Sequence, residues 1–200
     1  MVEHIELSKD LVNSIDLSSL VSYCDWHDNS KFFNLSAGNE HYKLLAYLAS
    51  KIKCKHYIDI GTYFGFSALA LSSDINKQVI TYDICDWIPE KGSNTINQRT
   101  NITRKIMDCK KDIESLISTD LIVLDIDPHD GIEERHIMDT LEVNGYRGIV
   151  VLDDIHVNDN MNTFWNNISQ KKIDVTNVGH FSGSGIVIFD PSRFDIICRQ

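Results

Sequence analysis

Short apolar runs alternate with helical patterns over most of the chain. Runs rich in apolar and β-branched side chains at residues 57–60, 79–82, 121–124 and 148–152 predict four β-strands. The last two runs are continuously apolar, as in parallel strands that are buried on both faces of a sheet. Because helical patterns separate the runs, we expect an α/β fold with a doubly wound, mostly parallel sheet and helices on both of its faces.

The same pattern predicts further, shorter elements. They are a strand at 102–107, helices at 112–117, 132–141 and 161–168, and two C-terminal strands at 175–179 and 185–189. Residues 181–184 read as a hairpin connection between the last two, which predicts an antiparallel addition at the C-terminal end of the sheet. Residues 84–101 predict a loop with a short helix, because Pro89 and Gly92 interrupt any longer pattern.

The N-terminal part is patterned less clearly. Residues 1–35 are polar with apolar side chains at mixed spacing, which predicts one or two short helices that form a cap or lid. A helix is expected from Ser36 onward, with Ser36 or Asn39 as its N-cap and leucines at helical spacing behind it. We therefore expect a main domain over residues 36–200 within one globular unit.

A glycine turn follows the first strong strand. Gly61 and Gly65 end the run at 57–60, and Ser67 begins an apolar helical pattern. A strand, a glycine turn and a helix form the nucleotide pocket of open α/β sheets, where the helix N-terminus offers free N–H groups. Asp59 lies inside the strand, where it does not suit a pyrophosphate. It suits a ligand with a cationic end, such as the ammonium group of a methionine moiety.

Two further aspartates follow predicted strands. Asp83 comes about 20 residues after the glycine turn, at the position where nucleotide folds place an acid that accepts from ribose hydroxyls. Asp108 follows the strand at 102–107 and is expected to accept from an adenine amino group.

Composition and charge restrict the kinds of partner and the cellular compartment that we expect for this protein. The net charge of −10 argues against nucleic acid or an anionic membrane as the main partner. The five cysteines form no Cys-x-x-Cys pair, which favours reduced thiols. No apolar run is long enough to span a bilayer, and no apolar core follows a basic start. We expect a cytoplasmic protein that acts on a small molecule or a glycan. It would work either as a homodimer or beside an adjoining domain.

Aspartates gather where the apolar strands end. Asp125 follows the run at 121–124, and Asp153 and Asp154 follow the run at 148–152. The carboxyl ends of parallel strands meet at one crevice, where crowded carboxylates repel each other unless a cation lies among them. This all-oxygen set predicts a divalent cation, with magnesium as the expected ion, held by these three aspartates and with Asp127 in reserve.

The segment Gly61-Thr62-Tyr63-Phe64-Gly65-Phe66-Ser67 resembles the Gly-x-Tyr-x-Gly-aromatic-Ser motif of catechol O-methyltransferase-like class I methyltransferases. Asp83, Leu124-Asp125 and Asp153-Asp154 follow in the order of that family, so the resemblance covers residues 36–190. It implies a Rossmann-like, seven-stranded fold, S-adenosylmethionine as cofactor and metal ligands at the last two sites. The methionine end would be held by Asp59, Gly61, Tyr63, Gly65 and Ser67, the ribose by Asp83 and the adenine side by Asp108.

The chain differs from this family at the position of the expected catalytic base. The catechol enzymes carry a lysine three residues after the fourth-strand aspartate, and Pro128 stands there in this chain. The candidate catalytic residues are therefore Asp125 as a metal ligand and, as the base, His129 or else His156 or His180.

The acceptor is inferred from the polar residues that follow the strands. The expected rim consists of His129, Asp130, His156, Asn158, Asn160, Trp165, His180 and Ser182. It suits a sugar or other polyol better than a catechol or phenol, and related metal-dependent families methylate sugars and glycans as well as catechols.

Three other functions stay open. Asp125-Ile126-Asp127 resembles the Asp-x-Asp of nucleotide-sugar glycosyltransferases, although the glycine turn has no use there. An NAD-dependent dehydrogenase is a weaker alternative, because this chain lacks the third glycine of the Gly-x-Gly-x-x-Gly motif. A module that binds S-adenosylmethionine without catalysis is the remaining alternative.

Overall fold

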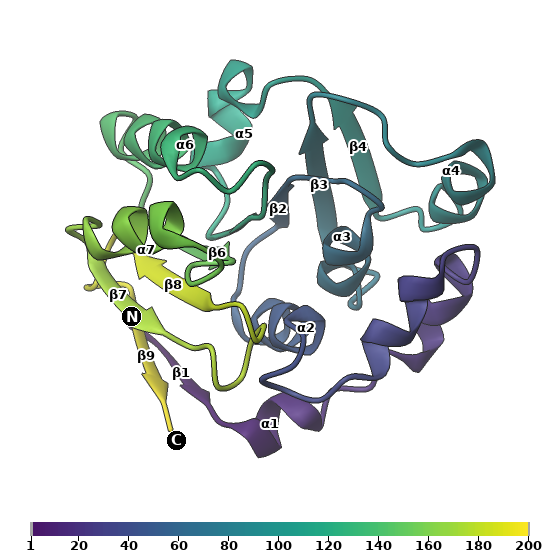
Figure 1. Cartoon of the computed structure of the whole chain (residues 1–200), viewed down its shortest axis with the longest axis horizontal. Coiled ribbons are helices and arrows are strands. Elements are labelled where there is room, and N and C mark those ends of the chain that lie inside the picture. The colour runs from purple at the N-terminus through teal and green to yellow at the C-terminus, as the bar shows by residue number, and fades with distance from the viewer. Residues whose placement is uncertain (1, 200) are drawn as a thin grey trace.

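The computed structural model describes residues 2–199, and its centre is a seven-stranded sheet (Figure 1). The strands, in their order across the sheet, are β4 (Ile102–Ile106), β3 (Gln78–Asp83), β2 (His56–Ile60), β5 (Leu121–Leu124), β6 (Ile149–Asp153), β8 (Ser184–Ile188) and β7 (Lys171–Asp174). Strand β8 runs antiparallel to both of its neighbours, β6 and β7, and the other neighbouring pairs in this sheet are parallel. The predicted fold class, a mostly parallel sheet with an antiparallel C-terminal strand, is confirmed.

Helices cover both faces of this sheet, as expected. They are α2 (Tyr42–Lys51), α3 (Phe66–Leu71), α4 (Glu90–Ile96), α5 (Ile113–Ile117), α6 (Ile132–Val143) and α7 (Asp159–Asn166). Leu121 and Val123 of β5 pack into the same core as α2 and α3, whereas Ile122 and Leu124 pack into the core with α6 and α7. This alternation explains the continuously apolar strands, because each face of the sheet meets its own helical layer.

The N-terminal segment contains the expected short helices and one strand that was not predicted. Its elements are β1 (Glu3–Leu7), α1 (Lys9–Asn13) and the 3-10 helices η1 (Ser18–Tyr23) and η2 (Asp28–Asn34). Strand β1 pairs in parallel with β9 (Phe194–Cys198) in a separate two-stranded sheet. Met1 and Gln200, the outer ends of the two predicted segments, lie outside the described residues.

The structure corrects the predicted start of one helix and one predicted strand. Helix α2 begins at Tyr42 with His41 as its N-cap residue, because Ser36 and Asn39 bond each other in the preceding turn. The strand expected at 175–179 is a turn, and β7 ends at Asp174, whose carboxylate accepts from the backbone N–H of Thr176. No helix in residues 2–199 has the length and apolar character needed to cross a membrane.

Candidate active site

The turn after β2 brings the ends of two strands into contact. Gly61 has φ +102°, and a Cβ there would lie 1.6 Å from the carbonyl oxygen of Asp125. The backbone N–H of Asp125 in turn donates to the carbonyl of Ile60 at 3.0 Å. Gly65, with φ +81°, precedes α3 as its N-cap residue. Only a residue without a side chain at position 61 lets the β2 turn lie this close to β5.

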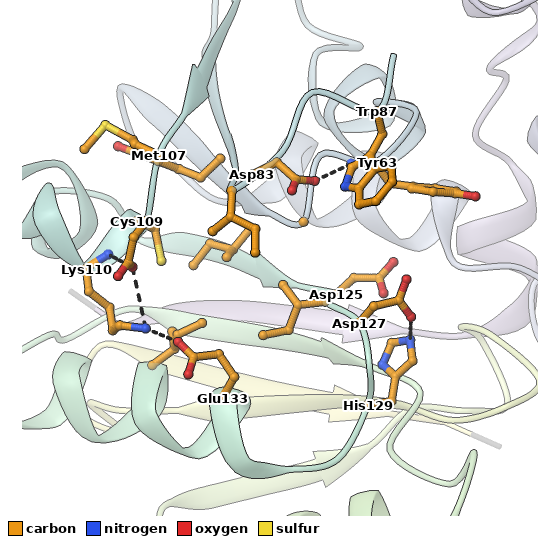
Figure 2. Close-up of a pocket in the computed structure, with 17 residues that line it drawn as sticks. Tyr63, Asp83, Trp87, Met107, Cys109, Lys110, Asp125, Asp127, His129 and Glu133 are labelled. Carbon is orange, nitrogen blue, oxygen red and sulfur yellow. Dashed lines mark hydrogen bonds and ion pairs between the residues drawn. The ribbon is translucent and has the colours of Figure 1, made fainter. Parts of the chain in front are cut away.

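A cavity of about 490 Å³ opens beside this turn (Figure 2). It is lined by Ile60, Gly61, Tyr63, Tyr82, Asp83, Ile84, Trp87, Met107, Asp108, Cys109, Lys110, Asp125, Ile126, Asp127, His129, Glu133 and Ile137. The structure thus brings together seven of the residues that the sequence singled out. Its size is that of a pocket for a small ligand or cofactor.

Asp83 is held in a fixed orientation at the end of β3. Its carboxylate accepts from the backbone N–H of Tyr63 at 2.9 Å and from that of Cys85 at 3.1 Å. The first of these bonds is drawn in Figure 2, where the carboxylate of Asp83 lies next to Tyr63. Tyr63 has φ +42°, so the turn itself presents this N–H to the carboxylate. The arrangement leaves carboxylate lone pairs on the cavity side for ligand hydroxyls.

Asp108 lies further along the cavity wall. It accepts from the backbone N–H of Lys110 at 2.9 Å, at the start of the 3-10 helix η3 (Cys109–Lys111). The ammonium group of Lys110 pairs with Glu133 of α6, and Figure 2 shows this pair on the opposite side of the cavity from Tyr63. The ion pair joins the segment after β4 to α6 and bounds the cavity there.

Three residues expected to hold the cofactor lie outside the cavity lining: Asp59, Gly65 and Ser67. Asp59 is fully buried and accepts from the hydroxyl of Thr81 at 2.6 Å, while its Oδ1 has no hydrogen-bond partner within residues 2–199. Burial raises the pKa of Asp59 to about 6, although the hydroxyls of Thr81 and Ser67 oppose the shift. Asp59 is thus a buried acid behind the glycine turn, with one oxygen free.

The aspartates at the ends of β5 and β6 are surrounded by histidines. His41 Nδ1 lies 3.1 Å from Asp153 Oδ2, and His180 Nδ1 lies 3.2 Å from the same oxygen. His180 also lies 3.3 Å from Asp154, as does His129 Nε2. The three predicted aspartates do come together, but as part of an aspartate–histidine cluster, which we define as His41, Asp125, His129, Asp153, Asp154 and His180.

Burial and the neighbouring charges together set the pKa values of the side chains in this cluster. Burial raises the pKa of Asp125 well above its usual range, and the Asp153 carboxylate adds to the shift. Burial disfavours the charged form of His41 and His180, but the adjacent carboxylates outweigh it and raise the pKa to about 9 and about 10 respectively. In return, the two imidazoles hold the pKa of Asp153 below its usual range, despite its burial.

The donor set fits a divalent cation. Ligand atoms of His41, Asp125 and Asp153 lie within 4.8 Å of one another, and so do those of Asp153, Asp154 and His180. Carboxylate oxygens and imidazole nitrogens are both common ligands of divalent metals. The sequence interpretation counted oxygens alone, whereas the structure adds imidazoles.

Sequence reasoning missed Glu40 and His41. Both are buried, at 6% and 4% exposure, immediately before α2. Two polar residues directly before an apolar helix were the available signal, but such residues are also ordinary helix caps. Their approach to β6 depends on where α2 packs.

The three candidate bases occupy different environments. His129 lines the cavity, with φ +55° and Nε2 directed to Asp154 and, at 3.5 Å, to Asp127. His180 is held between Asp153 and Asp154. His156 is outside both the cavity and the cluster, because its ring nitrogens bond Asn162 at 2.9 Å and Asp174 at 2.7 Å.

The expected acceptor rim is only partly formed. Ser182 donates to Asp154, and the side chain of Asn158 donates to the carbonyl of His129, so both lie by the cluster. Trp165 does not belong to the rim. It is 6% exposed and packs over Gly185 of β8, where a Cβ would lie 2.6 Å from its ring. Phe181, 73% exposed beside His180, is an aromatic side chain that the sequence interpretation passed over.

No family model matches the chain, and no curated protein matches it. Solved structures do. PaMTH1, a methyltransferase from Podospora anserina with bound SAH, is 15% identical with TM-score 0.59, covering 86% of this chain and 88% of its own. TomG, an O-methyltransferase of tomaymycin synthesis from Streptomyces achromogenes in complex with SAM, is 16% identical with TM-score 0.58, covering 92% and 99%. A putative caffeoyl-CoA O-methyltransferase from Staphylococcus aureus is 15% identical with TM-score 0.56, covering 74% and 82%.

Likeness at these identities concerns the fold. It extends over most of both chains in each comparison. The chain therefore has the Rossmann-like fold of S-adenosylmethionine-dependent methyltransferases.

Proposed function

We propose that the protein is an S-adenosylmethionine-dependent O-methyltransferase that acts on a hydroxyl of a small polar acceptor. One observation carries this proposal: a single cavity runs from Asp83 and Asp108 to Asp125 and His129, where the aspartate–histidine cluster begins. A nucleoside site and a site for proton transfer therefore adjoin. SAH in PaMTH1 and SAM in TomG, which share the fold, support the choice of cofactor.

The cofactor has a fitting position along the cavity. The oriented carboxylate of Asp83 would accept from the ribose hydroxyls, and Asp108 would accept from the adenine amino group. The Gly61 turn would hold the methionine end, with the acid of Asp59 buried behind that turn as the partner for its ammonium group.

The reaction at that end is an in-line displacement. The acceptor oxygen forms a bond to the methyl carbon as the carbon–sulfur bond breaks, and its electrons return to sulfur to give S-adenosylhomocysteine. His129 takes the acceptor proton, because it alone among the three candidate histidines lines the cavity. A bound divalent cation would make the acceptor hydroxyl more acidic and orient it. Asp125, Asp153 and Asp154 would hold this cation, with imidazoles beside them.

We propose a sugar or glycan hydroxyl as the acceptor, with a catechol or phenol as the alternative. Asp127, Asn158 and Ser182 offer hydrogen bonds around His129 and Asp154, as a polyol requires. The exposed rings of Tyr63, Trp87 and Phe181 favour a ligand with an apolar face, which sugars and phenols both have. All five cysteines are free thiols, which supports the cytoplasm as the compartment.

Ligand binding and turnover test this proposal in sequence. We expect S-adenosylhomocysteine to raise the melting temperature at saturation, since it binds the folded state alone. Stabilisation by UDP-sugars or NAD instead would reject the proposal in favour of a glycosyltransferase or a dehydrogenase. Methyl transfer from labelled S-adenosylmethionine to a panel of sugars, glycans and catechols then identifies the acceptor. Binding without transfer to any of these acceptors would favour the non-catalytic module.

A further inference from the structure

We propose that Glu134 is a positioning residue for His129, because its buried carboxylate lies behind the imidazole and accepts a hydrogen bond from Nδ1 when ligands fill the cavity. This bond holds the ring in place and leaves Nε2 without a proton on the cavity side. The inference rests on the proposed function, in which His129 takes the acceptor proton, and it names the residue that orients this base.

The carboxylate of Glu134 is the main observation. Its side chain is 3% exposed, and neither of its oxygens has a hydrogen-bond partner in the part of the chain that the structure describes. A buried carboxylate without hydrogen bonds lowers the stability of the fold. Packing alone therefore gives no reason for an acid at this position, and a role outside stability has to account for it.

The position of Glu134 in α6 accounts for only part of this. Glu134 is the third residue of the helix, after the N-cap residue Gly131. Burial raises the pKa of Glu134, and the nearby backbone N–H groups of Glu134 and Gly131 and the imidazole of His129 oppose the shift. These N–H groups attract the carboxylate, as at other helix N-termini, but neither of its oxygens is in hydrogen-bonding geometry with them.

The imidazole of His129 lies between Glu134 and the cavity. Glu134 Oε1 lies 4.0 Å from Nδ1 of His129. The other ring nitrogen, Nε2, lies 3.3 Å from Asp154 and 3.5 Å from Asp127. The ring thus has a buried carboxylate on one side and the cavity, with Asp127, on the other (Figure 2).

The gap between Nδ1 and the carboxylate is small enough to close. A movement of about 1 Å at the flexible end of the Glu134 side chain brings the two atoms to hydrogen-bonding distance. Catalytic hydrogen bonds commonly tighten in this way when the substrate binds.

The backbone around His129 is held on both sides. The carbonyl of His129 accepts from the side chain of Asn158 at 2.9 Å. Gly131 has φ +75°, and a Cβ there would lie 2.8 Å from the Cβ of Phe164, so the turn packs closely against α7. The side-chain torsions of His129 are then the main freedom that remains, and a hydrogen bond from Nδ1 to Glu134 restricts them.

Proton transfer at His129 gives the carboxylate its function. Nε2 takes the acceptor proton while Nδ1 keeps its own, so the ring becomes an imidazolium beside Glu134. The carboxylate stabilises this positive charge and does not itself take the proton. A base that is oriented by a third group in this way is the arrangement found in catalytic triads.

Nitrogen NMR of the full chain with labelled histidine tests the orientation without any turnover. At about pH 9, well above the ordinary histidine pKa of about 6.5, His129 should carry its proton on Nδ1 when S-adenosylhomocysteine is bound. The Nδ1 proton should persist in Glu134→Gln, whose amide oxygen still accepts, and move to Nε2 in Glu134→Leu. His129→Asn assigns the resonance.

Turnover gives a second readout. In Glu134→Leu we expect kcat to fall about 10²-fold, the cost of a misplaced catalytic group, with KM close to the wild-type value. Glu134→Gln should recover to within about tenfold of the wild type, because it keeps the hydrogen bond but not the charge. Glu142→Gln, at an exposed acid in the last turn of the same helix, is the matched control and should behave like the wild type.

The melting temperature separates this role from a structural one. Neither variant of Glu134 should melt at a lower temperature than the wild type, because each removes a buried carboxylate without hydrogen bonds. An acid that only supported the fold would lose stability, cofactor binding and activity together.

Three results would overturn the inference. They are a wild-type kcat in Glu134→Leu, an Nδ1 proton that persists in that variant, and a fall in its kcat that comes with a lower melting temperature. The same experiments separate the two proposals. A wild-type chain with the Nδ1 proton but no methyl transfer to any acceptor rejects the proposed function, whereas normal methyl transfer by Glu134→Leu rejects this inference alone.

Discussion

Gly61 and Asp125 are in contact through their backbones: a Cβ added to Gly61 would lie 1.6 Å from the carbonyl oxygen of Asp125. The two residues end neighbouring strands that carry different parts of the site. Gly61 belongs to the turn that positions Asp83 through Tyr63, and Asp125 begins the aspartate–histidine cluster. The distance between the proposed cofactor position and the cluster therefore depends on this contact.

Replacement of Gly61 by alanine should separate the two strand ends. The overlap is with backbone, which no rotamer change relieves, so we expect a loss of roughly 4 kcal/mol in the free energy of unfolding. Gly145→Ala is the matched control, because it has a similar φ of +74° but no atom within 4 Å of the new Cβ. It should lose about 1–2 kcal/mol from backbone strain alone. Chemical denaturation of both variants measures the difference, and equal losses would contradict the contact.

Asp59 is a buried acid, so we expect its replacement by asparagine to make the protein more stable and to weaken its binding of S-adenosylhomocysteine. The folded-state pKa of Asp59, about 6, is higher than its usual 3.8, so the fold loses stability as the pH rises from about 3.8 to about 6, and the full cost of the buried charge applies above about pH 6. Asp59→Asn should therefore raise the free energy of unfolding at pH 8, by up to about 3 kcal/mol, and by less at pH 5. Affinity for S-adenosylhomocysteine should fall at the same time, because the ammonium group loses its partner.

Denaturation at the two pH values and calorimetry with S-adenosylhomocysteine check this pair of effects. A gain in stability that is the same at pH 5 and pH 8 would show that Asp59 is not the group that titrates. Unchanged affinity would instead remove Asp59 from the methionine subsite.

Local patterns predicted the centre of the sheet well. Strands β5 and β6 are buried on both faces, so nearly every residue in them is apolar, and Asp125 and Asp153 end the two runs. The glycine turn was equally visible, since the positive φ at Gly61 and Gly65 admits few other residues. At these positions, burial or a positive φ restricts which residues can occur, so the residue types alone indicate the structure.

Contacts between distant segments were not predictable in this way. The pairing of β1 with β9 joins Glu3 to Phe194, and neither run shows more than ordinary strand propensity. His41 reaches Asp153 only because α2 packs beside the sheet. Trp165 was expected at the rim but lies over Gly185, whose missing side chain leaves room for the ring. These placements follow from packing that a single sequence does not reveal.

The carboxylate of Asp83 should determine cofactor affinity. In Asp83→Asn the side chain keeps one acceptor oxygen for the turn, but it loses the charge and the second acceptor for ribose hydroxyls. We expect the dissociation constant of S-adenosylhomocysteine to rise about tenfold, as for loss of one hydrogen bond to a charged group. Asp86→Asn, which removes an exposed carboxylate that pairs with Arg104 outside the cavity lining, should leave affinity unchanged. Calorimetry that finds both variants equal to the wild type would exclude Asp83 as the ribose acid.

The identity of the base can be tested without disturbing the loop that carries it. His129 has φ +55°, a conformation that asparagine tolerates better than most residues, so His129→Asn removes the imidazole and keeps the backbone. With the acceptor found in the methyl-transfer screen, kcat should fall about 10²- to 10⁴-fold, the usual contribution of a general base. S-adenosylhomocysteine should bind as in the wild type, because Asp83 and Asp108 are untouched.

His156→Asn is the matched comparison. Its imidazole bonds Asn162 and Asp174 outside the cavity, so kcat should stay close to the wild-type value. An equal fall in both variants would mean that neither imidazole acts on the acceptor directly. If His129→Asn kept full turnover, the proton would have to leave through the aspartates, and His129 would be only a partner of Asp154. The ratio of the two kcat values therefore decides whether the histidine in the cavity replaces the lysine that this chain lacks.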